Sequence, residues 1–260
     1  MKLKDKSALV TGAGSGIGKS IAEAFAREGA CVAIADLNLS AAQTASKQIN
    51  LAGGRAIHFQ MDVASEDQVN AVVEQVVREA GALDVLVSNA GIQVINPIVD
   101  FSFSDWRKVV AIHLDGAFLT TRAAMRAMIS QGRGGTILYM GSVHSHLASP
   151  NKSAYVAAKH GIMGLAKAVA KEGAKHGIKS NVICPGFVRT PLVEKQIPEQ
   201  AQQLGINEEE VVKKVMLGET VDGEFTSMED VAATAVFLAS FPSSALTGQS
   251  IVVSHGWFMQ

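Results

Sequence analysis

A turn of alternating glycines follows the first apolar segment of the chain. It runs Thr-Gly-Ala-Gly-Ser-Gly-Ile-Gly from Thr11 to Gly18, between an apolar segment at 6–11 and a helical pattern at 17–29. Small residues here let the backbone turn sharply from a strand into a helix and approach a pyrophosphate, whose charge is favoured at the helix N-terminus. Glycine runs also occur in flexible loops, so the surrounding pattern decides. The candidate pyrophosphate-binding residues are Gly12, Gly14, Ser15, Gly16, Ile17 and Gly18.

Short β-branched segments alternate with longer helical ones along the whole chain. This alternation predicts an α/β fold, a doubly wound parallel sheet of the Rossmann type with helices on both faces. The nearly continuous hydrophobicity of the short segments indicates buried strands. We expect strands at 6–11, 31–36, 55–59, 84–88, 136–140, 179–183 and 249–253, and helices at 17–29, 40–51, 66–80, 104–130, 152–176 and 227–240.

No proline-rich or serine-rich linker interrupts this order, so we expect a single domain over residues 1–260. The exception to the pattern is the segment 190–222, which carries a proline and two amphipathic pieces. A long insertion after a sheet strand commonly covers a binding site. We therefore predict a substrate lid at 190–222.

Charge and cysteine content exclude several classes of protein. The chain has 23 Lys and Arg against 24 Asp and Glu, and its net charge of -1 gives no long-range attraction for nucleic acid or an anionic membrane. No segment approaches the ~18 apolar residues of a membrane span. Cys31 and Cys184 are far apart, so we expect no disulfide framework and no metal site, and we expect a reducing, cytoplasmic location.

Asp36 is the candidate that selects the cofactor. It lies 18 residues after Gly18, at the end of the second predicted strand, where a carboxylate accepts hydrogen bonds from the adenosine ribose hydroxyls. It would repel a 2′-phosphate, and no Arg or Lys follows in Leu37, Asn38 and Leu39, so NAD is favoured over NADP. The alternative is a helix-capping or loop carboxylate.

Two further loops extend the predicted cofactor site. Asp62 and Val63 follow the third strand, and Asn89, Ala90 and Gly91 follow the fourth, beside the crevice where the strand order reverses. Asp62 is a candidate for holding adenine, and the loop from Asn89 would let the ribose approach. Each loop alone would be an ordinary turn.

Three residues form a candidate proton-transfer site. Tyr155 and Lys159 are four residues apart and share one face of a helix, where an ammonium group stabilises a phenolate. Such a pair is also common on solvated helix surfaces. Ser142 lies at the end of the fifth strand, where its hydroxyl can hydrogen-bond a substrate oxygen beside the tyrosine.

With these motifs the chain resembles the short-chain dehydrogenase/reductase family. The resemblance covers TGAGSGIG at 11–18, SNAG at 88–91, GS at 141–142, YVAAK at 155–159 and PGFVRT at 185–190. It implies strand order 3-2-1-4-5-6-7, Tyr155 as general acid/base, Lys159 as a nicotinamide-ribose ligand that lowers the tyrosine pKa, and Ser142 as the substrate-orienting residue. It also implies a homotetramer joined through the helices at 104–130 and 152–176. Its nicotinamide loop maps onto Pro185, Gly186, Val188 and Thr190.

The chain departs from the family pattern at a few positions. His113 stands where a relay asparagine is usual, and an imidazole there would either hold the same water or distort the relay. Ser88 replaces another asparagine. Ser254 and His255 replace an acid and a glycine near the C-terminus.

Within the family, the stretch 151–161 and the run at 184–197 resemble bacterial D-3-hydroxybutyrate dehydrogenases. The resemblance places Gln93, His144, Lys152 and Gln196 around a substrate carboxylate. Lys152 also precedes Tyr155 by three residues at a helix N-terminus, which favours a small anion there. The alternatives are an exposed first-turn lysine and a packing or solvated His144. Trp257 would close a small apolar pocket, or else serve as an interface aromatic.

These residues predict reversible, NAD-dependent oxidation of (R)-3-hydroxybutyrate to acetoacetate. One alternative is an NAD(P)-dependent reductase of another small oxo-acid or of a 3-oxoacyl thioester. A further alternative, motivated by His113, Ser254 and His255, is an NAD-sensing protein without catalysis.

Overall fold

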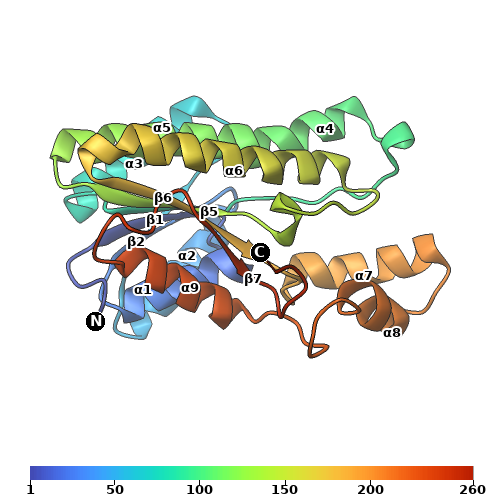
Figure 1. Cartoon of the computed structure of the whole chain (residues 1–260). Coiled ribbons are helices and arrows are strands. Elements are labelled where there is room, and N and C mark those ends of the chain that lie inside the picture. The colour runs from blue at the N-terminus through green and yellow to red at the C-terminus, as the bar shows by residue number, and fades with distance from the viewer. Residues whose placement is uncertain (260) are drawn as a thin grey trace.

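The computed structural model describes residues 1–259, with the side chain of residue 192 left out; Gln260, the last residue of the predicted domain, lies outside the described residues. Its centre is one parallel sheet of seven strands in the order β3-β2-β1-β4-β5-β6-β7 (Figure 1). The predicted fold class and strand order are therefore confirmed. The strands are β1 Ser7–Thr11, β2 Cys31–Asp36, β3 Arg55–Gln60, β4 Val85–Ser88, β5 Gly135–Met140, β6 Ile178–Pro185 and β7 Ser250–Val253.

Helices cover both faces of this sheet. On one face lie α1 Gly16–Arg27, α2 Leu39–Leu51 and α9 Met228–Ser240, and on the other lie α3 Glu66–Ala80, α4 Phe103–Val110, α5 Gly116–Gln131 and α6 Ser153–Gly173 (Figure 1). Each layer packs its apolar side chains onto one face of the strands, giving two hydrophobic clusters separated by the sheet. Within residues 1–259, none of the helices combines the length and the apolar character needed to cross a bilayer.

Most predicted element boundaries agree with the structure to within two residues or so, because local signals set them. Ser65 caps α3 by accepting a hydrogen bond from the backbone of Gln68, and Gly81 ends the same helix with φ 82°. The predicted helix at 104–130 is different. A π-helical turn, Ala111–Asp115, separates α4 from α5, and His113 in this turn contacts Ile92 in the loop after β4.

The segment 190–222 forms a separate helical layer beyond the carboxyl edge of the sheet. It contains α7 Pro191–Leu204, α8 Glu208–Glu210 and a π-helical segment Val211–Met216. Thr190 caps α7 by accepting a hydrogen bond from the backbone of Val193. The layer has a small core of its own, built on Val193, Ile197, Val211 and Met216. The two amphipathic pieces thus pack on each other as well as on the sheet edge.

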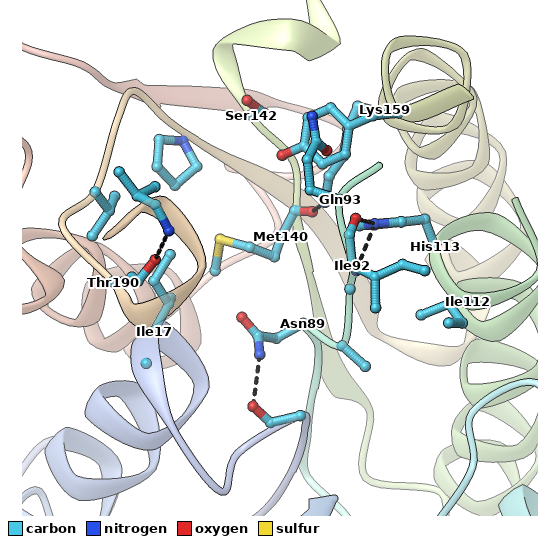
Figure 2. Close-up of a pocket in the computed structure, with 18 of the residues that line it drawn as sticks. Ile17, Asn89, Ile92, Gln93, Ile112, His113, Met140, Ser142, Lys159 and Thr190 are labelled. Atoms are coloured by element: carbon cyan, nitrogen blue, oxygen red, sulfur yellow. Dashed lines mark hydrogen bonds between the residues drawn. The ribbon is translucent and has the colours of Figure 1, made fainter. Parts of the chain in front are cut away.

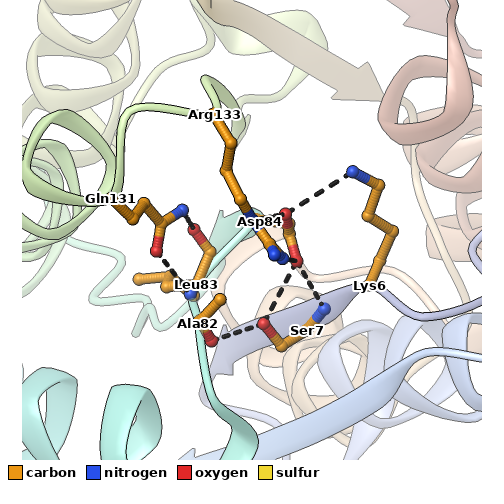
Figure 3. A network of polar contacts seen from close by, with 7 residues as sticks. All are labelled: Lys6, Ser7, Ala82, Leu83, Asp84, Gln131 and Arg133. Carbon is orange, nitrogen blue, oxygen red and sulfur yellow. Dashed lines mark hydrogen bonds and ion pairs between the residues drawn. The ribbon is translucent and has the colours of Figure 1, made fainter.

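The opposite, amino-terminal edge of the sheet is fixed by a buried carboxylate. Asp84, just before β4, accepts hydrogen bonds from the backbone of Ser7 at 2.9 Å and from Arg133 Nη2 at 2.6 Å, and Lys6 lies 3.5 Å away (Figure 3). Burial alone would raise the pKa of Asp84, but the hydrogen bonds from Arg133 and Ser7 outweigh it and hold the pKa below its usual value. This network joins the starts of β1, β4 and β5, far from the carboxyl ends of the strands.

Candidate active site

A cavity of about 430 Å³ lies at the carboxyl ends of the strands, where the strand order reverses between β1 and β4. It gathers nearly all of the predicted cofactor-binding, substrate-binding and proton-transfer residues; of these, Gly14 and Gly18 do not line it. The predicted residues that line it are Gly12, Ser15, Gly16, Ile17, Asp36, Asp62, Val63, Asn89, Ala90, Gly91, Gln93, His113, Ser142, His144, Lys152, Tyr155, Lys159, Pro185, Gly186, Val188, Thr190, Gln196 and Trp257.

The glycine turn forms one wall of the cavity, and backbone angles or close contacts favour glycine at three of its positions. Gly12 has φ 61° and Gly16 has φ 55°, values that favour glycine. A Cβ on Gly18 would lie 2.4 Å from the Gly12 carbonyl oxygen and 2.5 Å from Asn89 Nδ2. Asn89 donates to the carbonyl oxygens of Thr11 and Gly12 at 2.9 and 3.2 Å, so it ties the turn to β4 (Figure 2). The bare backbone ahead of α1 fits a dinucleotide pyrophosphate.

Asp36 ends β2 beside this turn. Its two carboxylate oxygens accept hydrogen bonds from the backbone of Gly14 and of Asn38, each at 2.9 Å. The helix-capping alternative is wrong, because the N-cap of α2 is Asn38. Asp36 still lines the cavity, where the described residues include no arginine and two lysines, Lys152 and Lys159. An uncompensated carboxylate at this end fits an adenosine ribose with free hydroxyls better than one carrying a phosphate.

The loop after β3 is held mainly by its own turn. Asp62 accepts a hydrogen bond from the backbone of Ala64 at 2.9 Å, and its own backbone donates to Gln68 Oε1 at 2.9 Å. Val63 packs against the next layer, since a Cβ on Gly116 would lie 2.9 Å from its Cγ2. Asp62 and Val63 thus reach the cavity from a rigid turn.

The three candidate proton-transfer residues converge from two elements. Ser142 follows β5, while Tyr155 and Lys159 lie on α6. The Lys159 ammonium group donates to the Met140 carbonyl oxygen at 2.5 Å (Figure 2). It lies 5.3 Å from the centre of the Tyr155 ring, and the Ser142 hydroxyl is close enough to influence the tyrosine pKa. Lys159 is 3% exposed, so the solvated-surface alternative is wrong.

Burial dominates the titration of this group. It raises the pKa of Tyr155 to about 12, although the hydrogen bond with Ser142 works in the opposite direction. It also lowers the pKa of Lys159 to about 8. Burial is thus the larger influence on the Tyr155 pKa here, and the Lys159 ammonium group lies over the ring and is bonded to Met140. That Lys159 lowers the tyrosine pKa stays a prediction.

His113 enters the site from the π-helical turn between α4 and α5. Its Nε2 lies 2.7 Å from the Ile92 carbonyl oxygen and 3.1 Å from the Ile92 nitrogen, and its ring meets that of Tyr155 edge-on at 5.3 Å (Figure 2). Nδ1 is buried and has no partner within residues 1–259. A Cβ on Gly91 would lie 2.3 Å from His113 Cε1, so the glycine makes room for the ring.

The buried imidazoles predict a loss of stability in acid. The pKa of both His113 and His144 is lowered to about 3, mainly by burial. The positive charge of Lys159 also lowers the pKa of His113, and that of Lys152 does so at His144. Because the unfolded chain takes up these protons near pH 6.5 and the folded protein only near 3, stability falls as the pH drops below 6.5, by about 1.4 kcal/mol per unit for each ring. Urea unfolding between pH 6.5 and 4.5 should show a shallower fall for His113→Asn. The exposed His58→Asn is the control, and an unchanged slope in His113→Asn would contradict the prediction.

Lys152 provides a second buried ammonium group. It is 7% exposed at the N-terminus of α6, so the exposed first-turn alternative is wrong. Its Nζ lies 5.0 Å from the centre of the Phe187 ring, and no carboxylate of the described residues pairs with it. Burial lowers its pKa to about 8. A cationic site without a counter-ion in the cavity suits an anionic ligand.

His144 is buried, and neither of its ring nitrogens is free to bind a ligand in the cavity. Its Nε2 lies 2.7 Å from Ser149 Oγ and its Nδ1 lies 3.3 Å from Ser142 Oγ. Both ring nitrogens therefore have serine partners, and the ring holds Ser142 in place. Contact between His144 and a substrate carboxylate, as the resemblance implies, would require one of these pairs to open.

Trp257 lies in the cavity wall rather than apart from it. Its ring stacks on Phe187 with centroids 5.0 Å apart and planes 3° from parallel, and it meets His144 edge-on at 5.6 Å. Two groups of the site were not predicted from the sequence, Phe187 and the Met140 carbonyl. Phe187 stands between Gly186 and Val188 of the predicted nicotinamide loop, a signal that could have revealed it.

Two glutamines complete the polar lining. Gln93 presents a buried Oε1 that lacks a hydrogen-bond partner in residues 1–259, and Gln196 is buried where α7 passes over the cavity. Cys184 is buried and Cys31 partly buried, and both are free. Across the described chain, no three His, Cys, Asp or Glu side chains are arranged to hold a metal ion.

Comparison with known proteins agrees with this geometry. Residues 6–201 match the family model described as short chain dehydrogenase. The chain is 40% identical to a D-beta-hydroxybutyrate dehydrogenase of Rhizobium meliloti (strain 1021), over 98% of this chain and 99% of that protein. It is 37% identical to a 3-oxoacyl-(acyl-carrier-protein) reductase of Thermotoga maritima, over 98% and 99% of the two chains.

A solved structure shares both the fold and the sequence pattern. The crystal structure of a short-chain type dehydrogenase/reductase from Mycobacterium marinum superposes with a TM-score of 0.91 at 34% identity, covering 99% of this chain and 97% of that one. The relatives and the solved structure agree over nearly the whole length, and the family model agrees over residues 6–201. The chain therefore belongs to the short-chain dehydrogenase family.

Proposed function

We propose that this oxidoreductase catalyses the reversible, NAD-dependent oxidation of (R)-3-hydroxybutyrate to acetoacetate. The observation that carries the proposal is the buried ammonium group of Lys152, which shares a cavity with Tyr155 and has no counter-ion among the described residues. Isolating such a charge costs several kcal/mol, which an anionic ligand offsets. The D-beta-hydroxybutyrate dehydrogenases similar to this chain support a carboxylate as that anion.

The spacing of Lys152 and Tyr155 favours a short acid. The two residues lie three positions apart at the start of α6, so their side chains lie near each other on one side of the helix. A carboxylate held at Lys152 leaves the alcohol carbon two bonds further on, near the tyrosine hydroxyl. Gln93 and Gln196 line the same cavity, and in this proposal both donate to the carboxylate while α7 acts as the lid that carries Gln196.

Each of the proton-transfer residues has a separate role in the proposed reaction. Tyr155 first loses its own hydroxyl proton and then, as the phenolate, takes the proton of the substrate hydroxyl. Ser142 hydrogen-bonds the substrate oxygen as it becomes a carbonyl, and Lys159 binds the nicotinamide ribose. His113, neutral at working pH, occupies the place of the relay asparagine and offers Nδ1 to a water. NAD, when bound, supplies the acceptor for the hydride leaving the substrate C3.

NAD is the proposed cofactor because Asp36 faces the adenosine end of the cavity without a neighbouring cation. The glycine turn would hold the pyrophosphate, and the nicotinamide loop 185–190 would hold the nicotinamide end of the cofactor.

We further propose that the enzyme works in the cytoplasm, since its two cysteines are free, and that it forms a homotetramer through α5 and α6. Sedimentation measures the assembly.

The test is an absorbance assay of NADH formation with the R and S acids supplied separately, each with NAD and with NADP. We expect turnover with the R acid and NAD. No turnover with the R acid, or a preference for NADP, would refute the proposal. The reductase of Thermotoga maritima named above motivates one more reaction, reduction of an acetoacetyl thioester with NADPH. A faster reaction there would favour the thioester alternative.

A further inference from the structure

The C-terminal segment 254–258, here called the tail, contacts residues 219–222, the last part of the segment 190–222. Figure 1 shows the C-terminal end between β7 and the layer of α7 and α8. His255 Nδ1 lies 2.6 Å from Asp222 Oδ2, and the Val221 nitrogen donates to the His255 carbonyl oxygen at 2.9 Å. Trp257 Nε1 donates to Glu219 Oε2 at 2.9 Å.

The backbone of the tail is bent to make these contacts. His255 has φ 50°, a left-handed value that is uncommon for a residue with a side chain, and Gly256 has φ 74°. A Cβ on Gly256 would lie 2.7 Å from Val221 Cγ1, so the tail lies directly against residues 219–222. The contact with that segment therefore fixes the path of the chain into Trp257.

Trp257 has two different sides. The ring faces lie in the cavity, stacked on Phe187 and edge-on to His144, whereas the indole nitrogen points to the exposed carboxylate of Glu219. Stacking alone permits the indole to slide and rotate in its plane, since parallel aromatic pairs tolerate offset. A hydrogen bond from one ring edge to a charged acceptor removes that freedom.

We propose that Glu219 is a positioning residue that holds the Trp257 indole over the substrate end of the cavity and thereby limits the length of the acid that fits. This proposal rests on the proposed function in one respect, namely that the substrate is a short hydroxy acid. Glu219 itself is outside the cavity lining and does not contact the reacting atoms. Its effect reaches the substrate only through the ring of Trp257.

Two variants test this role. Glu219→Ala removes the acceptor, and we expect KM for (R)-3-hydroxybutyrate to rise about fivefold with little change in kcat, and the preference for the four-carbon over the five-carbon acid to fall by a similar factor. Glu219→Gln keeps an oxygen acceptor and should restore most of the preference. In a Trp257→Phe background, which lacks the indole donor, Glu219→Ala should have no further effect.

A measurement without substrate accompanies the kinetics. With Trp106→Phe as background, Trp257 is the single tryptophan, and Glu219→Ala should make its fluorescence more accessible to acrylamide. Glu224→Ala, a nearby exposed acid, is the matched control. Equal quenching in the two variants would overturn the proposal. An unchanged chain-length preference in Glu219→Ala would also overturn the proposal, because it is the result expected if Glu219 had only a structural role. If the wild type fails to oxidise the acid, the proposed function fails while quenching still decides the role of Glu219.

Discussion

Tyr155→Phe is expected to lower kcat by about three orders of magnitude while leaving NADH binding intact. The change removes one hydroxyl group, the proposed donor and acceptor of the substrate proton, and general acid/base groups typically contribute a factor of about 10² to 10⁴. The ring that packs edge-on against His113 and His144 remains, so the surroundings of Lys159 should keep their geometry. Steady-state rates and NADH fluorescence titration measure the two quantities separately.

Tyr139→Phe is the matched control, because it removes the other tyrosine hydroxyl of the chain. Tyr139 is buried in β5 and bonded to Thr121, and it does not line the cavity. We expect Tyr139→Phe to affect stability more than kcat. Full activity in Tyr155→Phe would exclude the tyrosine as the acid/base, and an inactive wild type that still binds NADH would favour the sensing alternative.

Lys152→Met should have opposite effects on catalysis and on stability. Loss of the carboxylate partner is expected to lower kcat/KM for the acid by about 10² to 10³, since truncating one member of a buried charge pair costs about 2 to 5 kcal/mol. The free protein should become more stable at pH 7 by roughly 2 kcal/mol, because an isolated buried charge is replaced by an apolar chain of similar length. Kinetics with the R acid and urea unfolding measure the two effects.

The stability gain should depend on pH in a defined direction. The folded protein holds the pKa of Lys152 at about 8, below its usual value, so the unfolded chain binds the proton more tightly. The cost of the buried charge is fully present below pH 8 and disappears as the pH rises towards about 10.5. The advantage of Lys152→Met should shrink over the same interval. Lys167→Met, at an exposed position of α6, is the control, and a constant advantage would contradict the assignment.

The sequence predicted the sheet and most of the cavity lining because those features follow from local patterns. Glycines at 12–18 predict a strand-to-helix turn, and apolar segments predict buried strands. Parallel strands bring the loops that follow them to the carboxyl edge of the sheet. The partners of His144 were not predictable in this way. Its two serines lie within the same loop, and the choice between solvent, substrate and serine depends on how that loop folds.

Other features depend on segments that are distant in sequence. The pKa of Tyr155 reflects burial by several elements, and no local spacing reports that burial. Glu219 and Trp257 are 38 positions apart and belong to different pieces of irregular chain, so neither residue signals the other. The π-helical turn at Ala111–Asp115 also lacked a signal, because its sequence is compatible with an ordinary helix.

That turn divides the helical stretch 103–131 into two parts with different angular phase. Each α-helical residue advances the chain by 100°, so a turn widened by about one residue offsets the apolar stripe after it from the stripe before it. The part before the turn, α4, packs against α6, whereas the part after it, α5, packs mainly against α3. A deletion of one residue within 111–115 would bring the two apolar stripes back into register. The helix would then pack well against α6 or against α3, but not against both. The irregularity that carries His113 is thus also what allows one stretch of helix to serve two partners on different sides.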